Sequence, residues 1–236
     1  MELMTHCGIF DFGAGREPDW AMHEGWWLHD RAVTVAQYER YLGDILAEGR
    51  RAGITFTGLT WPGCSRATGT RHHAELRASG RRGPNPALWT ALLTLARNAR
   101  FRGPTVPCFF DSIDEADGLR RKAQEGSHAV FDLMPNALDQ FGSWSNSRDR
   151  VNPDYYITAD GRSGIIPRRV EAQAPYCLWY AHWQGLNPVK GVGWGALRTV
   201  VTRTRKHLDG HVVWLRPSDI TRRYQEAGGW GFLDNL

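Results

Sequence analysis

The sequence is poor in lysine and cysteine, and these shortages exclude several common functions. Lysine occurs only at Lys122, Lys190 and Lys206, and arginine supplies the rest of the 29 basic residues. The arginines are scattered and form no basic block interleaved with aromatic side chains, so nucleic-acid binding is not expected. The four cysteines form no CxxC pair, which argues against a structural zinc site. Cys108 and Cys177 lie in apolar runs and are predicted to be buried free thiols.

Long hydrophobic runs and nucleotide-binding motifs are also missing. No apolar run approaches the ~18 residues of a membrane-spanning helix, so no membrane partner is expected. The first residues, MELMTHCGIF, show no basic region followed by an apolar stretch. No signal peptide is therefore predicted, and a cytoplasmic location is expected. No GxGxxG motif follows the first predicted strand and no P-loop is present, so the sequence lacks the usual nucleotide signatures of a doubly wound sheet.

The composition is that of an ordinary globular protein apart from its tryptophans. The chain has 236 residues, enough for one large domain or two small ones, and its content of 42% hydrophobic and 23% charged residues is ordinary for a globular protein. The 11 tryptophans are unusual. Indole rings suit either a packed core or stacking on flat ligands such as sugars or bases.

Apolar, β-branched and aromatic runs alternate with helical patterns along the chain. Thr34 with Gln37 forms a capping box that starts one helix, and Asn85 followed by Pro86 starts the next. A third helix is predicted over 193–210, with Trp194, Leu197, Val201 and Leu208 aligned on one side, and a fourth begins at Ser218. Strands are predicted at six segments: 6–12, 54–61, 106–110, 128–133, 176–183 and 211–216.

Strands that alternate with helices are typical of βαβ units and a parallel sheet. We predict an α/β fold whose parallel (β/α) barrel is distorted or incomplete, with about six to seven strands. Functional groups of such barrels gather at the C-terminal ends of the strands. In this chain those ends carry Trp61, Asp111, Asp132 and His182, whereas Asp139 and Asp154 are expected to be solvated.

The first forty residues hold several potential metal ligands. His6, His23 and His29 are accompanied by Asp11 and Asp30. Two histidines with nearby carboxylates form a common type of divalent-metal site.

Three segments carry a family resemblance: MTHCGIFDFGAG with the long helix after it, ITFTGLTWPGC, and YCLWYAHWQGLNP with the residues through LRPSDI. They resemble, in this order, the metal-histidine segment, the groove-lining strand with its Pro-Gly turn, and the C-terminal end of the polysaccharide deacetylase family. That family belongs to the glycoside hydrolase/deacetylase (β/α)-barrel superfamily, so the resemblance implies a single barrel domain over residues 1–236.

The resemblance implies a hydrolase that acts on acetylated carbohydrate with a divalent metal, usually zinc, held by two histidines and an aspartate. His6 matches a metal histidine, and His23 and His29 compete for the second position. His182 matches the late-strand histidine that donates a proton to the leaving amine. Asp111 falls where the family keeps an acidic residue that orients the acid or base. Trp27, Trp61 and Trp183 are the candidate sugar-stacking residues.

The chain departs from the family at its N-terminal end. The family's paired aspartates precede the metal histidines, whereas only five residues precede His6. Three explanations stay open. The chain lacks an N-terminal segment of the family's barrel, or it has lost catalysis and keeps a sugar-binding groove. In the third, the missing carboxylate comes from Asp11, Asp30 or Asp111.

Two other functions compete with the deacetylase hypothesis. A carboxylate-only glycoside hydrolase would use Asp111 with Asp132 or Asp11, at a carboxyl separation of roughly 5–10 Å. A non-catalytic carbohydrate-binding protein would stack sugars on exposed tryptophans, for which the candidates are Trp26, Trp27, Trp61 and Trp183. The sequence does not predict an oligomeric state.

Overall fold

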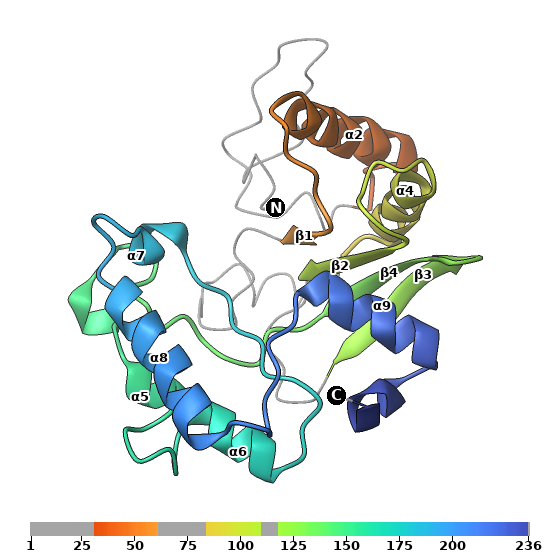
Figure 1. The fold of residues 1–236 in the computed structure, drawn as a ribbon. Coiled ribbons are helices and arrows are strands. Elements are labelled where there is room, and N and C mark those ends of the chain that lie inside the picture. The colour runs from red at the N-terminus through yellow and green to blue at the C-terminus, as the bar shows by residue number, and fades with distance from the viewer. Residues whose placement is uncertain (1–30, 61–83, 110–117, 236) are drawn as a thin grey trace. The chain divides into compact units, whose positions relative to one another are not determined.

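The computed structural model describes residues 31–60, 84–109 and 118–235 (Figure 1). These residues form two compact units, each described by itself below. Unit 1 contains residues 31–60, 84–109, 118–134 and 216–229, and unit 2 contains residues 135–215 and 230–235. The chain enters unit 2 at residue 135, returns to unit 1 at residue 216 and enters unit 2 again at residue 230. Because it crosses several times, the sequence shows no single linker.

Unit 1 is built on an open sheet of four strands in the order β1-β2-β4-β3. Strands β1 (Leu59–Thr60), β2 (Thr105–Phe109) and β4 (His128–Leu133) run parallel, and β3 (Leu119–Glu125) pairs antiparallel with β4. The predicted α/β class is confirmed in this mixed, mostly parallel form. The residues that the structure describes contain no closed barrel.

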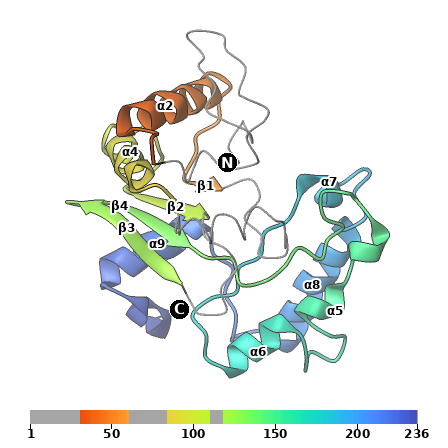
Figure 2. The same cartoon turned by 180° about the vertical axis from the view of Figure 1, so that it is seen from behind.

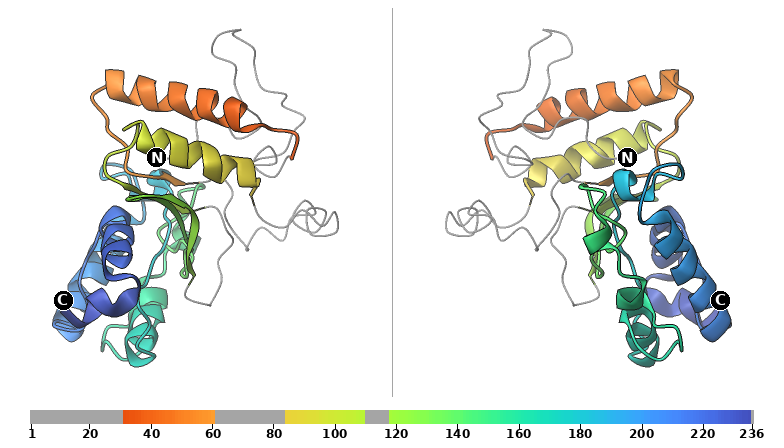
Figure 3. Two further views of the ribbon diagram at one scale, coloured as in Figure 1. Left: turned by 90° about the vertical axis from the view of Figure 1, so that its right-hand side faces the viewer. Right: turned by 90° about the vertical axis from the view of Figure 1, so that its left-hand side faces the viewer.

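Helices cover both faces of this sheet (Figures 1 and 3). Helices α2 (Val35–Arg51) and α4 (Pro86–Arg97) pack side by side over one face, where Val106 and Val130 join their core. Helix α9 (Pro217–Ala227) lies on the other face. There the Thr105 and Thr221 hydroxyls are 3.0 Å apart, and Phe131 meets Tyr224 edge to face. Strands covered on both faces need apolar side chains on both sides, which explains the continuous apolar runs at 106–110 and 128–133.

The predicted helix starts in unit 1 are confirmed. The Thr34 hydroxyl accepts a hydrogen bond from the Gln37 amide, and the Gln37 side chain accepts one from the Thr34 amide. The Asn85 side chain accepts from the Ala87 amide, with Pro86 at the first helical position. Each cap satisfies backbone donors that the first turn of a helix leaves without a partner.

Strand β3 was not predicted, because its sequence LRRKAQE is mostly polar. It lies at the edge of the sheet, where charged side chains reach water and discourage pairing with other chains. Its register with β4 shifts between Arg121 and Ala123, which makes Lys122 the extra residue of a β-bulge. The Lys122 ammonium lies 5.3 Å from the centre of the Trp89 ring and 3.6 Å from the Asp132 carboxylate.

Unit 2 is helical and irregular (Figure 2). Its helices are α5 (Pro153–Tyr156), α6 (Ile165–Glu171), α7 (Trp183–Leu186) and α8 (Trp194–His207), with short 3-10 turns at Arg148–Arg150 and Trp230–Asn235. The rings of Phe141 and Tyr156 stack at 4.7 Å in its core, and Trp179 lies 5.1 Å from Tyr156. Burial raises the pKa of the Tyr156 hydroxyl, which donates to the Leu138 carbonyl at 2.6 Å.

Two strand predictions in this region are wrong. Segment 176–183 forms only a single bridge, between Ala137 and Trp179, and then enters α7. Its backbone pairs instead with the Asn136 side chain, which accepts from the Leu178 amide and donates to the Tyr176 carbonyl. Segment 211–216 is irregular and leads into α9, with Trp214 exposed. Strand-like composition in both segments reflects aromatic packing rather than a sheet.

The side of α8 predicted from its apolar residues is only partly buried. Leu197 and Leu208 pack against the core of unit 2, whereas Trp194 is exposed. The fully buried residues are Ala196, Val200 and Thr204. The buried residues recur every four positions and are small, which allows α8 to approach α5 closely. No described helix is long and apolar enough to cross a membrane.

Candidate functional site

In unit 2, the loop before Phe141 meets the segment that leads into α7. The Asn136 and Ala137 amides both donate to the Leu178 carbonyl, at 2.9 and 3.1 Å. These bonds fix the two segments side by side over a few residues. They bring Asp139, on the first segment, to His182, which is the N-terminal cap residue of α7.

Asp139 and His182 form a tightly bonded pair. The Asp139 Oδ2 atom lies 2.7 Å from His182 Nδ1 and also accepts from the His182 backbone amide at 3.0 Å. The Asp139 Oδ1 atom accepts from the Phe141 amide at 2.8 Å. Only 3% of the Asp139 side chain is exposed, compared with 37% of the His182 side chain. A buried carboxylate therefore holds a histidine that can still reach a ligand.

The bond to Asp139 fixes the chemistry of the histidine ring. Because the carboxylate accepts at Nδ1, that nitrogen carries the proton, and Nε2 is the nitrogen available for transfer to or from a ligand. The structure describes no residue that hydrogen-bonds Nε2. A histidine oriented in this way by a buried acid is a recurring arrangement for general acid–base catalysis.

Asp139 is held in its charged form by its surroundings. Burial alone would raise its pKa. The hydrogen bonds from the His182 ring, the Phe141 amide and the His182 amide, together with the charge of His182, lower the pKa by more than burial raises it. The net result is a pKa below the ordinary value of an aspartate. The carboxylate therefore stays ionised and can stabilise a protonated His182 ring.

We expect the pair to give the fold an acid-sensitive contribution to stability. Because the pKa of Asp139 is lower in the folded chain than in the unfolded chain, this contribution is present above about pH 4 and is lost as the pH falls through the folded value. Denaturant unfolding of the wild type and Asp139→Asn between about pH 6 and about pH 2 measures it. The stability difference between the two proteins should shrink on acidification, and a difference independent of pH would contradict this account.

Trp183 follows His182 directly and begins α7. Among the described residues it is one of the most exposed large apolar ones, at 68%. The Tyr180 ring meets the His182 ring edge to face, with centroids 5.9 Å apart.

Of the residues selected through the family resemblance, the structure describes His182 and Trp183. The others lie outside the described residues and stay predictions: His6, Asp11, His23, Trp27, His29, Trp61 and Asp111. The described parts of the chain contain no group of three or more His, Cys, Asp or Glu side chains that could hold a metal ion.

Sequence reasoning missed Asp139, which was expected to be solvated and is buried instead. The Asp139 side chain accepts from the amide two residues later, at Phe141, which is a common turn pattern for aspartate. This pattern was the only local signal that Asp139 has a structural partner. Asp154, also expected to be solvated, is exposed and pairs with Arg203. Asp132 is buried in β4 of unit 1, so it does not belong to the unit that holds the Asp139–His182 pair.

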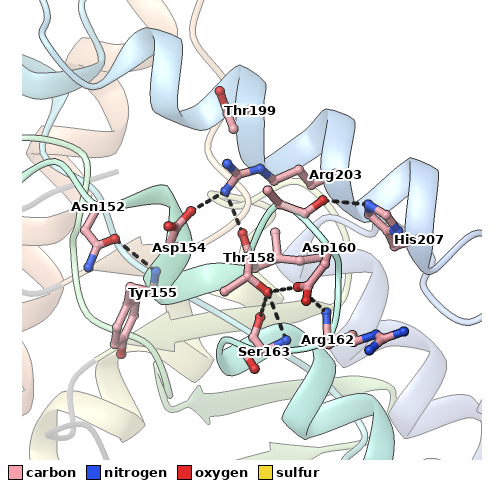
Figure 4. A network of polar contacts seen from close by, with 12 residues as sticks. Asn152, Asp154, Tyr155, Thr158, Asp160, Arg162, Ser163, Thr199, Arg203 and His207 are labelled. Carbon is pink, nitrogen blue, oxygen red and sulfur yellow. Dashed lines mark hydrogen bonds and ion pairs between the residues drawn. The ribbon is translucent and has the colours of Figure 1, made fainter.

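A second polar cluster in unit 2 is explained by packing (Figure 4). Arg203 of α8 donates to the Ile157 carbonyl at 2.8 Å and pairs with Asp154. The His207 ring donates from Nε2 to the Ala159 carbonyl at 3.0 Å. A Cβ atom on Gly161 would lie 2.4 Å from that ring, so the loop packs directly on the histidine. These contacts fasten loop 158–163 to α8 and use the polar groups that a site would need.

Comparison with known proteins adds no assignment. No protein-family model matches the chain, and no significant match is found among curated proteins or among solved structures.

Proposed function

We propose that the protein is a hydrolase of the polysaccharide deacetylase type that removes acetyl groups from carbohydrate. The observation that supports this most is the Asp139–His182 pair, because the histidine that resembles the family's proton donor is the one that a buried acid holds. The exposed Trp183 beside it offers a stacking surface for a sugar ring. The family's (β/α) barrel is part of the proposal and is supported by the parallel strands β1, β2 and β4, whereas β3 is antiparallel and the segment that carries His182 is not a strand.

In the proposed reaction, water adds to the acetyl carbonyl carbon, and the bond from that carbon to the sugar nitrogen or oxygen breaks. The doubly protonated ring of His182 donates its Nε2 proton to the leaving atom, so that acetate and a free amine or hydroxyl are released. Asp139 keeps the ring in one orientation and stabilises its positive charge before the proton is given up. The ring then regains a proton from the attacking water or from solvent.

A divalent metal remains part of the proposal through His6, His23 and His29. The described residues do not themselves form a metal site. We expect the purified chain to contain a stoichiometric divalent metal, and His6→Ala to lose it, because neutral imidazole is a strong ligand for zinc. Elemental analysis of both proteins measures this, with His211→Ala as the control. A folded wild-type chain free of metal would contradict this part of the proposal.

One observation favours a second candidate, a carbohydrate-binding protein without catalysis. Trp183 is exposed whether or not His182 transfers protons, and an indole alone suffices for binding. Such a protein has no use for a histidine held by a buried carboxylate, and for this reason we prefer the hydrolase.

The experiment that tests the proposed function is release of acetate by the full-length protein. Suitable substrates are oligomers of N-acetylglucosamine and O-acetylated xylan, with reducing ends measured in the same samples. Acetate without new reducing ends supports a deacetylase. New reducing ends without acetate would support the glycoside hydrolase, and binding without either product would support the carbohydrate-binding protein.

A further inference from the structure

Three exposed tryptophans lie on neighbouring segments of unit 2. Trp144 lies in the turn that follows Phe141, Trp183 begins α7, and Trp194 begins α8. Their exposed fractions are 64%, 68% and 40%. Single exposed apolar residues are common, but several on adjoining segments mark an interaction surface.

The backbone of these segments is packed closely around the Phe141 carbonyl. A Cβ atom on Gly185 would lie 2.1 Å from that oxygen, and one on Gly193 would lie 1.9 Å from it. The Gly193 amide also donates to the Gly185 carbonyl at 2.9 Å. Glycine is required at both positions because the chains approach too closely for any side chain. The segments that carry the tryptophans are therefore held in fixed positions.

A side-chain clamp joins the turn of Trp144 to the loop before α8. The Asn146 side chain accepts from the Val192 amide at 2.9 Å and donates to the Lys190 carbonyl at 3.2 Å. Figure 1 shows α7 beside the loop that leads into α8. From the reach of the chain, the Cα atoms of all three tryptophans lie within about 15 Å of Gly185.

The composition around the three rings indicates the ligand. Segments 141–147 and 183–195 contain one charged residue, Lys190, and the other polar side chains are serine, asparagine and glutamine. So little charge does not suit a nucleic acid or a strongly acidic partner. Rings spaced among uncharged hydrogen-bonding groups suit the flat apolar faces and hydroxyls of neutral sugars.

We propose that Trp144, Trp183 and Trp194 form a stacking surface for a neutral oligosaccharide, which extends from the Asp139–His182 pair over more than one sugar ring. The inference rests on the proposed function, because the surface is placed next to His182 as the catalytic residue. Two features link the tryptophan-bearing segments to the Asp139–His182 pair. The Phe141 amide donates to Asp139, and Trp183 directly follows His182 in the chain.

Binding to the inactive His182→Asn protein tests the stacking surface separately from catalysis. The probes are the monomer and the hexamer of N-acetylglucosamine, followed by calorimetry or tryptophan fluorescence. We expect the hexamer to bind more tightly than the monomer, and Trp144→Ala and Trp194→Ala each to weaken hexamer binding about 3- to 10-fold. Trp214→Ala, at a partly exposed tryptophan outside these segments whose ring meets Trp179 edge to face, is the matched control and should leave affinity unchanged.

The outcomes separate the two proposals. Equal affinity for monomer and hexamer, no effect of Trp144→Ala and Trp194→Ala, or the same loss in Trp214→Ala would overturn the stacking surface. If the hexamer binds through Trp144 and Trp194 but the wild type releases no acetate, the surface stands and the hydrolase proposal fails. Circular dichroism of each variant confirms that the chain is folded.

Discussion

The variant His182→Asn is expected to lower kcat for acetate release by about 10²- to 10⁴-fold, the range for loss of a general acid or base. Asparagine places an amide N–H near the position of Nδ1, so the hydrogen bond to the buried Asp139 can be kept. It removes the nitrogen that exchanges protons with the substrate. The expected result is therefore a loss of rate with nearly unchanged stability, measured by initial rates and by denaturant unfolding.

The matched control for this substitution is His211→Asn. His211 is exposed in the same unit, and its known contact is made by its backbone amide, which donates to the Leu208 carbonyl. Its replacement should leave both rate and stability unchanged. If His182→Asn retained the wild-type rate, His182 would not be the proton donor and the proposed mechanism would be wrong.

The second large effect is expected at Gly193, where an added Cβ atom would lie 1.9 Å from the Phe141 carbonyl oxygen. Gly193→Ala should lower the free energy of unfolding by about 3 kcal/mol, because backbone atoms on both sides must move apart. The same displacement would reach Asp139, since the Phe141 amide binds its carboxylate. Activity should therefore fall together with stability, as thermal denaturation and rate measurements can show.

Gly195→Ala provides the comparison, two residues further along α8. A Cβ atom there would meet nothing within 4 Å. Alanine is a better helix former than glycine by up to about 1 kcal/mol, so this variant should be as stable as the wild type or more so. Equal stability of the Gly193→Ala and Gly195→Ala variants would show that the close packing around Phe141 is not what the structure indicates.

The parts of the fold that could be predicted from sequence are those set by local rules. The Thr34–Gln37 capping box and the Asn85-Pro86 start depend on side chains within three residues of the helix that they begin. Strands β2 and β4 were predicted within one residue of each end that the structure describes, because apolar runs covered by helices on both faces are distinctive.

The parts that failed depend on distant neighbours. β3 is an edge strand whose polar sequence carries no periodic signal, and it is a strand because β4 pairs with it. Segment 176–183 has the composition of a strand, but its backbone is satisfied by the Asn136 side chain some forty residues earlier. Pairing at such separations is not encoded in a local pattern.

The candidate site shows the same division. His182 could be selected because a polar residue ends an apolar run, and the structure describes it as half-exposed and bonded. Asp139 could not be selected, because a partner 43 residues away is recognised only when the fold brings the two together. An aspartate in a short loop is solvated more often than it is buried, and burial here follows from the hydrogen bonds that Phe141 and His182 donate.

The most direct test of the central claim is mass spectrometry of an acetylated oligosaccharide after incubation with the wild-type protein and with His182→Asn. A single spectrum reports both the number of acetyl groups and the length of the sugar chain. The account predicts stepwise loss of acetyl groups at constant chain length with the wild type, and an unchanged spectrum with the variant. An unchanged spectrum with folded, metal-supplemented wild type, or shortened chains that keep their acetyl groups, would contradict it.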